Sequence, residues 1–151
     1  MVKLQKLAMQ GFKSFSKKTV IPLYPGFNAV IGPNGNGKSN IIDAIVFVLG
    51  TSSRNLRADR MQHVIYNGGH GAKPADAAIV SLVLDNSDKA LKDQGELVLI
   101  SRRVNRRGNS VYRLNGKAVN RRKILDLMGE AHIDPEGYNI ILQGDIVRFV
   151  E

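Results

Sequence analysis

Several short segments of the chain are rich in apolar residues and are bounded by turn residues, which is the pattern of strands. The segments that predict strands are 3–9, 18–23, 27–31, 77–86, 96–104 and 138–144. Residues 110–120 predict a hairpin, because Asn115 and Gly116 stand where a two-residue turn would reverse the chain. The pattern therefore predicts a sheet-rich domain with a largely antiparallel β-lobe.

Two other segments have helical patterns. Residues 41–49 are apolar on all sides and contain one charged residue, Asp43, which predicts a buried core helix. This helix is too short to span a bilayer, which takes about 20 residues. Asn120 can cap a second helix over residues 121–131, which has one apolar face. The fold class predicted is α/β, with a mixed sheet around a glycine-rich loop and the antiparallel β-lobe beside it.

The glycine-rich loop lies between the strand at 27–31 and the core helix. Gly32, four further residues, Gly37, Lys38 and Ser39 have the spacing G-x-x-x-x-G-K-S of a phosphate-binding loop. Its glycines let consecutive N–H groups turn toward phosphate oxygens, and the helix that follows adds the positive end of its dipole. Lys38 is expected to reach the β- and γ-phosphates, and Ser39 to bind Mg²⁺. The predicted nucleotide-binding residues here are Gly32, Pro33, Asn34, Gly35, Asn36, Gly37, Lys38, Ser39 and Asn40.

Positive charge is concentrated in one part of the chain. The net charge is +9, and no acidic residue lies between Glu96 and Asp126. The basic residues of this window are Arg102, Arg103, Arg106, Arg107, Arg113, Lys117, Arg121, Arg122 and Lys123. A charge run can simply be a solvated face, but the lack of neutralising carboxylates favours a surface for a polyanion, with DNA as the expected one and the four arginines at 102–107 as its centre.

Composition sets the remaining limits. A chain of 151 residues with 43% hydrophobic residues is predicted to form a single globular domain. The absence of cysteine excludes disulfides and cysteine-ligated zinc within this sequence. The N-terminal residues have no sustained apolar core or cleavage site, so a strand is expected there and a cytoplasmic setting for the protein.

The chemistry of a complete phosphate-loop hydrolase is only partly present. Asp85 ends an apolar strand, as a Mg²⁺-shell aspartate would, but the next residue is Asn86, and closing a strand at a turn is the better interpretation. The histidines show no metal-ligand spacing and are expected on the surface or in loops. Two alternatives from other classes stay open: a nucleoside or nucleotide kinase whose lid uses the arginines near 102–107, and a DNA-binding module with a vestigial phosphate loop.

Six motifs follow one another along the chain: GFKSF (11–15), GPNGNGKSNIIDAIVFVLG (32–50), LRADR (56–60), VIYNG (64–68), YRLNGK (112–117) and GYNIILQGDI (137–146). Their order and spacing resemble the N-terminal half of the SMC (structural maintenance of chromosomes) ATPase head, over essentially the whole chain. The DAIVFVLG motif resembles archaeal and eukaryotic members more than bacterial ones. Asn36 departs from the family's usual serine, but its backbone N–H can still serve the phosphate cradle.

The resemblance implies an ABC-ATPase-like head that is split in two. The N-terminal lobe, here residues 1–151, holds the phosphate loop, and a long antiparallel coiled coil separates it from a C-terminal lobe with the signature motif and the catalytic glutamate. ATP and Mg²⁺ are the implied cofactors. The implied partners are DNA, the C-terminal lobe, a second head in a homodimer, and kleisin and accessory subunits, with no membrane. Turnover then belongs to the complete head dimer, on the chromosome, and this half alone is expected to be inactive.

The resemblance also gives roles to residues outside the phosphate loop. Gln143, in LQGD, resembles the glutamine whose amide oxygen joins the Mg²⁺ shell and orients the attacking water, so it is a candidate catalytic residue together with Lys38. Arg57, in LRADR, resembles the arginine that links DNA binding to ATP turnover. Lys13 and Ser14 lie in a loop that approaches the nucleotide, and residues 63–66 lie near where adenine packs in relatives.

Overall fold

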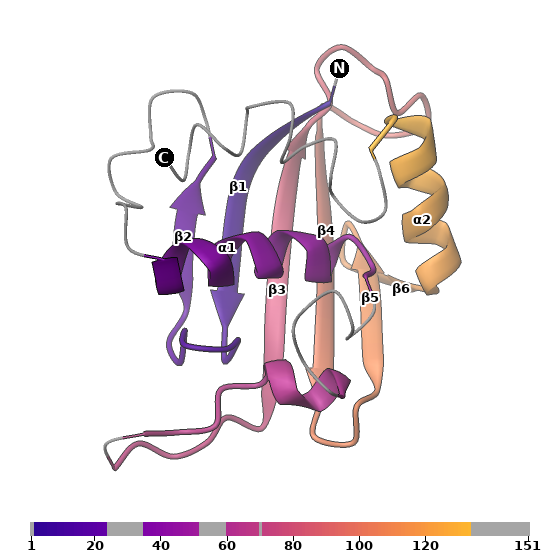
Figure 1. Cartoon of the computed structure of the whole chain (residues 1–151). Coiled ribbons are helices and arrows are strands. Elements are labelled where there is room, and N and C mark those ends of the chain that lie inside the picture. The colour runs from indigo at the N-terminus through magenta and orange to yellow at the C-terminus, as the bar shows by residue number, and fades with distance from the viewer. Residues whose placement is uncertain (1, 24–34, 52–59, 70, 134–151) are drawn as a thin grey trace.

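The structure is a computed structural model that describes residues 2–23, 35–51, 60–69 and 71–133. These residues form a six-stranded sheet, two α-helices and a short 3-10 helix (Figure 1). The strands are β1 (Lys3–Gln10), β2 (Thr19–Pro22), β3 (Ala77–Asp85), β4 (Leu97–Asn105), β5 (Ser110–Leu114) and β6 (Lys117–Val119). The helices are α1 (Gly35–Val48), the 3-10 helix η2 (Met61–Val64) and α2 (Arg121–Glu130).

The sheet has the strand order β2-β1-β3-β4-β5-β6, and every neighbouring pair is antiparallel. Helix α1 crosses one face of it, over β1, β3 and β4, while α2 lies beside the β5–β6 edge (Figure 1). The antiparallel β-lobe predicted from the sequence is therefore confirmed. The predicted strands at 27–31 and 138–144, which would supply the mixed part of the sheet, lie outside the described residues.

Burial alternates along the strands, so the sheet has an inner and an outer face. In β3, Ala78, Val80, Leu82 and Leu84 have no exposed surface, while the residues between them point to the other face. The inner side chains pack with α1, whose residues from Ala44 to Val48 are buried all round. Helix α1 is thus the core helix that its apolar sequence predicts. No helix within the described ranges is both long and apolar enough to cross a membrane.

Local sequence signals placed two elements correctly. The β5–β6 hairpin turns at Asn115 and Gly116, whose φ angles of 51° and 88° are those of a two-residue primed turn. Helix α2 begins after Asn120, whose side chain accepts a hydrogen bond of 2.9 Å from the backbone N–H of Lys123. The short helix η2 was not predicted, because its four residues are too few to show a helical period.

Candidate functional site

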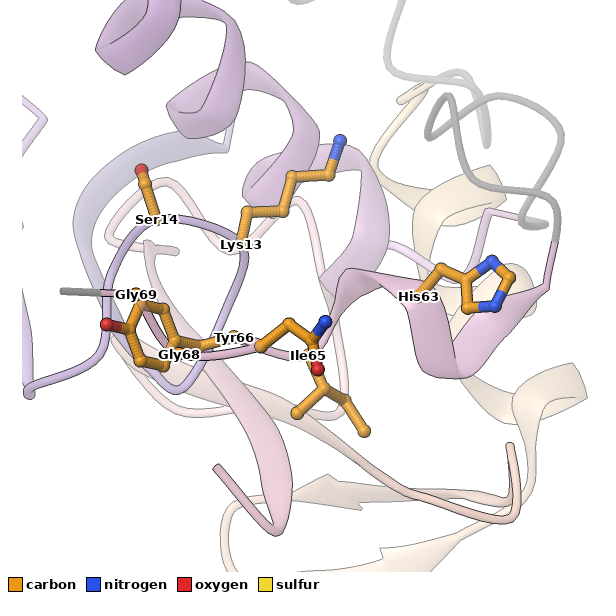
Figure 2. Close-up of a pocket in the computed structure, with 8 residues that line it drawn as sticks. Lys13, Ser14, His63, Ile65, Tyr66, Gly68 and Gly69 are labelled. Atoms are coloured by element: carbon orange, nitrogen blue, oxygen red, sulfur yellow. The ribbon is translucent and has the colours of Figure 1, made fainter. Parts of the chain in front are cut away.

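A cavity of about 580 Å³ opens between the loop that joins β1 to β2 and the segment that follows η2 (Figure 2). Its lining residues come from this loop, from η2 and from the segment after η2, and are Lys13, Ser14, His63, Ile65, Tyr66, Asn67, Gly68 and Gly69. Lys13, Ser14 and the segment 63–66, which are predicted to lie near the nucleotide, come together at this cavity. The imidazole of His63 points away from the other labelled side chains (Figure 2).

The two walls of the cavity are joined by backbone hydrogen bonds. The N–H of Lys13 donates to the carbonyl oxygen of Val64 at 2.6 Å, and the N–H of Tyr66 donates to that of Gly11 at 2.7 Å. Phe12, whose side chain is fully buried, forms isolated β-bridges to both Phe15 and Ile65. The loop at 11–15 is therefore a tight, anchored turn whose fixed backbone presents Lys13 and Ser14 to the cavity.

The same loop is tied to helix α1 by two side-chain contacts. The Nζ of Lys13 lies 2.6 Å from Oδ2 of Asp43, and these side chains are 15% and 8% exposed. The Nδ2 of Asn40 donates to Oγ of Ser14 at 2.8 Å. Figure 2 shows the side chain of Lys13 extending from its loop toward the helix. The cavity thus lies beside the helix that grows out of the phosphate-loop motif.

The structure describes only part of the phosphate loop itself. Helix α1 begins at Gly35, so the backbone of residues 35–39, including Lys38 and Ser39, forms its first turns. An N-terminal helix end offers unpaired N–H groups and a positive dipole to an anion. Asn40 lies one residue further on, and its amide contacts Ser14. The predicted residues Gly32, Pro33, Asn34, Arg57 and Gln143 lie outside the described residues.

Asp43 belongs to the site, but its ion-pair partner could not be predicted from the sequence. It stands out in the sequence as the one charge in an apolar helix, and such a buried carboxylate needs a cation or hydrogen-bond donors. That requirement was the available signal, but the partner, Lys13, lies 30 positions away in the chain. The structure therefore adds Asp43 to the residues around the cavity.

Arg102 corrects the prediction of a DNA-contacting residue. Its side chain is 4% exposed on the inner face of β4, and its Nη1 donates to the carbonyl oxygens of Phe47 and Thr51 at 2.8 and 2.9 Å. The guanidinium lies 4.3 Å from the centroid of the Phe47 ring and 4.9 Å from that of Tyr112. Burial lowers the pKa of Arg102 to about 10. A buried group that binds carbonyl oxygens in the last turn of α1 and just beyond it cannot contact DNA phosphates, so Arg102 is not part of the candidate surface.

The other three central arginines are exposed on and after β4. Arg103 projects from the outer face of the sheet, and Arg107 lies in the β4–β5 turn. Arg106 also has a structural contact: its Nε and Nη2 donate to the carbonyl oxygens of Ala75 and Tyr66 at 2.9 and 3.1 Å. Arg103 and Arg107 are therefore the clearest candidates for binding a polyanion.

Asp85 lies at the end of a strand and closes it at a turn, as predicted in preference to a role in the Mg²⁺ shell. It is the last residue of β3, and its Oδ1 accepts a hydrogen bond of 2.9 Å from the backbone N–H of Ser87. That backbone hydrogen bond is the main reason why the pKa of Asp85 lies below its ordinary value. The carboxylate closes the strand at a turn.

Known proteins are similar to this chain in both sequence and fold. Residues 3–137 match the RecF/RecN/SMC N terminal domain family. The chromosome partition protein Smc of Pyrococcus furiosus is 46% identical over 150 residues, and that of Aquifex aeolicus is 42% identical over 150 residues. Each alignment covers 98% of this chain and 13% of the relative, so the chain spans 13% of the length of these proteins.

Two solved structures have closely similar folds. One, from work on "ATP-driven dimerization and DNA stimulated activation of SMC ATPases", has a TM-score of 0.83 and 45% identity, covering 98% of this chain and 90% of that one. Another is the Smc head domain of Pyrococcus furiosus with an extended coiled coil, bound to the C-terminal domain of ScpA. Its TM-score is 0.84 at 45% identity, covering 92% of this chain and 35% of that one. These relatives support the SMC interpretation over a nucleoside kinase, and the chain belongs to the RecF/RecN/SMC N-terminal domain family, with the fold of SMC head domains.

Proposed function

We propose that this chain is the ATP-binding N-terminal half of the head of a chromosome-organising SMC ATPase. The carrying observation is the arrangement around the cavity: the loop with Lys13 and Ser14 is fastened to helix α1, which begins inside the phosphate-loop motif. A cationic side chain, an N-terminal helix end and an adjoining cavity suit a nucleoside triphosphate, whose phosphates need positive charge and whose base needs a wall to pack against.

In this proposal the phosphates lie over residues 32–39, with Lys38 beside the β- and γ-phosphates, and the base enters the cavity near Tyr66. Ser39 and Gln143 supply protein ligands to Mg²⁺. Within the described ranges, no cluster of three or more His, Asp or Glu side chains could hold a metal ion. Because Mg²⁺ is usually bound through few protein ligands plus substrate oxygens, we expect the ion to arrive with the phosphates.

Turnover is assigned to a larger assembly. The groups that complete hydrolysis would come from the C-terminal lobe of the same head and from a second head that engages around ATP. Arg57 would link DNA binding to turnover, and kleisin and accessory subunits would join the assembly on the chromosome. A relative is described as showing ATP-driven dimerization and DNA-stimulated activation, and another is bound to ScpA, which supports this part of the proposal.

The test is nucleotide binding by the 151-residue chain. A fluorescent ATP analogue with Mg²⁺ should bind the unmodified chain, and Lys38→Ala should abolish binding. Lys92→Ala, which removes an exposed lysine in the β3–β4 connection, is the matched control and should bind normally. Equal binding by the Lys38→Ala and control variants would contradict a phosphate role for Lys38 and favour the DNA-binding module with a vestigial loop.

Hydrolysis gives a second measurement. The chain alone should hydrolyse ATP negligibly, and addition of the C-terminal lobe of the same protein should produce turnover that Gln143→Ala reduces. Robust steady-state hydrolysis by the purified chain alone would contradict the assignment of the catalytic groups to another part of the protein. Phosphoryl transfer to an added nucleoside would instead identify a kinase.

A further inference from the structure

We propose that Asp43 and Asn40 are positioning residues for nucleotide binding: they hold Lys13 and Ser14 against helix α1 in the geometry that accepts the phosphates. This inference rests on the proposed function and assigns two helix residues a role beyond it. Both residues touch the loop at 11–15 and neither lines the cavity, so they act through Lys13 and Ser14.

The spacing of the two residues suits this role. Asn40 and Asp43 are three positions apart on a helix, which places them on the same side of α1. Their contacts reach consecutive residues of the loop, at 2.8 Å for Ser14 and 2.6 Å for Lys13. One face of the helix therefore contacts two consecutive residues of the loop and holds them in place.

The backbone conformation of Lys13 explains why the loop needs stabilising contacts. Lys13 has a φ of 48°, in the left-handed region that residues with side chains rarely adopt. Such a conformation persists only where surrounding contacts hold it. The hydrogen bond from Lys13 N–H to Val64 and the ion pair with Asp43 are two such contacts. Without the ion pair, we expect the loop to sample conformations in which the ammonium group leaves its place beside Asp43 on α1.

Charge alone makes the opposite prediction, which sharpens the test. Asp43 is a carboxylate close to the proposed site of a triphosphate, so its removal should strengthen the attraction of ATP if only net charge mattered. If Asp43 positions Lys13, its removal should weaken binding, because the loop must then be ordered when the nucleotide arrives. The sign of the change in affinity separates these two roles.

The experiment measures the dissociation constant of a fluorescent ATP analogue with Mg²⁺ for the 151-residue chain. We expect Asp43→Asn and Lys13→Met each to weaken binding by about fivefold to tenfold, and the double variant to be no weaker than Lys13→Met alone, because the two residues act as one unit. Asp43→Glu should recover much of the affinity. Asp126→Asn removes an exposed carboxylate of α2 that pairs with Arg122, and this matched control should leave binding unchanged.

Asn40→Ala provides a second variant that leaves the ion pair intact. It should weaken binding less than Asp43→Asn, and amide hydrogen exchange at Lys13 and Phe15 should become faster in both variants while the strand amides stay protected. Tighter or unchanged ATP binding by Asp43→Asn, or additive effects in the double variant, would overturn the positioning role. The proposed function would still stand in that case if ATP binding depends on Lys38. A wild-type chain that binds no nucleotide would overturn both.

Discussion

The guanidinium of Arg102 binds Phe47 in two ways at once: Nη1 donates to its carbonyl oxygen at 2.8 Å, and the group lies 4.3 Å from the centroid of its ring. Phe47 belongs to the last turn of α1, where carbonyl groups lack helical partners. Arg121 makes a related contact, donating from Nε to the carbonyl oxygen of Gly50 at 2.7 Å. Two arginines of the basic window thus stabilise the C-terminal end of the helix whose other end carries the phosphate-loop motif.

Arg102→Met should destabilise the domain by about 2–4 kcal/mol, because the carbonyl oxygens of Phe47 and Thr51 would have no donor in a buried place and two cation–π interactions would disappear. The measurement is urea unfolding followed by circular dichroism. Arg103→Met, at the next position on the exposed face of the same strand, is the control and should change stability little. Equal losses of stability in the two variants would show that Arg102 does not support the helix.

Tyr112 should titrate late in the folded protein. Its phenol is buried beside Arg102, and burial raises the pKa of Tyr112 above its ordinary value of 10.0 against the opposing effect of Arg102. A spectrophotometric titration at alkaline pH should show a phenolate component above pH 10 that Tyr112→Phe removes and Tyr66→Phe retains. Since the unfolded chain releases this proton first, the stability from Tyr112 is complete below pH 10 and is lost as pH rises through the higher folded pKa. A titration that Tyr112→Phe leaves unchanged would contradict the prediction.

Gly11→Ala should unfold or severely weaken the loop that carries Lys13. Gly11 has a φ of 68°, and an added Cβ would lie 2.3 Å from the carbonyl oxygen of Ala77. We expect a loss of about 2–4 kcal/mol, from the left-handed backbone and the overlap together. Gly116→Ala shares the positive φ but meets nothing within 4 Å, so it should lose only about 1–2 kcal/mol. Thermal unfolding of the two variants compares these costs directly, and equal losses would argue against the overlap with Ala77.

DNA binding should depend on Arg103 and Arg107 through interactions with phosphates. The double variant Arg103→Gln/Arg107→Gln should bind every duplex sequence more weakly and reduce the slope of log K against log salt by about 0.9 for each phosphate that is no longer neutralised. Lys89→Gln/Lys92→Gln removes the same charge from the exposed β3–β4 connection and is the control. Fluorescence anisotropy at several salt concentrations supplies both quantities. If affinity and slope survive, the arginines form a solvated face, and Lys3, Lys6, Lys17 and Lys18, or Arg57 and Arg60, are the next candidates.

The sequence by itself determined the elements whose cause is local. The hairpin turn at Asn115 and Gly116 follows from residues that accept positive φ, and helix α2 starts where Asn120 can cap it. Strand geometry also determined which residues of β3 and β4 share a face, since a strand turns successive residues to opposite sides. In these cases the deciding interactions span a few residues, so a short window of sequence holds all the information.

Only the tertiary structure decided which residues share a site. Lys13 and Asp43 are 30 positions apart, and Arg102 is 55 positions from Phe47, so no local pattern pairs them. The alternation of β4 places Arg102 on the same face as Ile100 and Val104, which indicates that it points inward. The run of arginines nevertheless favoured an exposed surface, and only the structure shows that Arg102 donates to carbonyl oxygens near the end of α1. A buried charged side chain needs hydrogen-bond or ion-pair partners. Because these partners lie far away in the sequence, only the packing of the folded chain shows which they are.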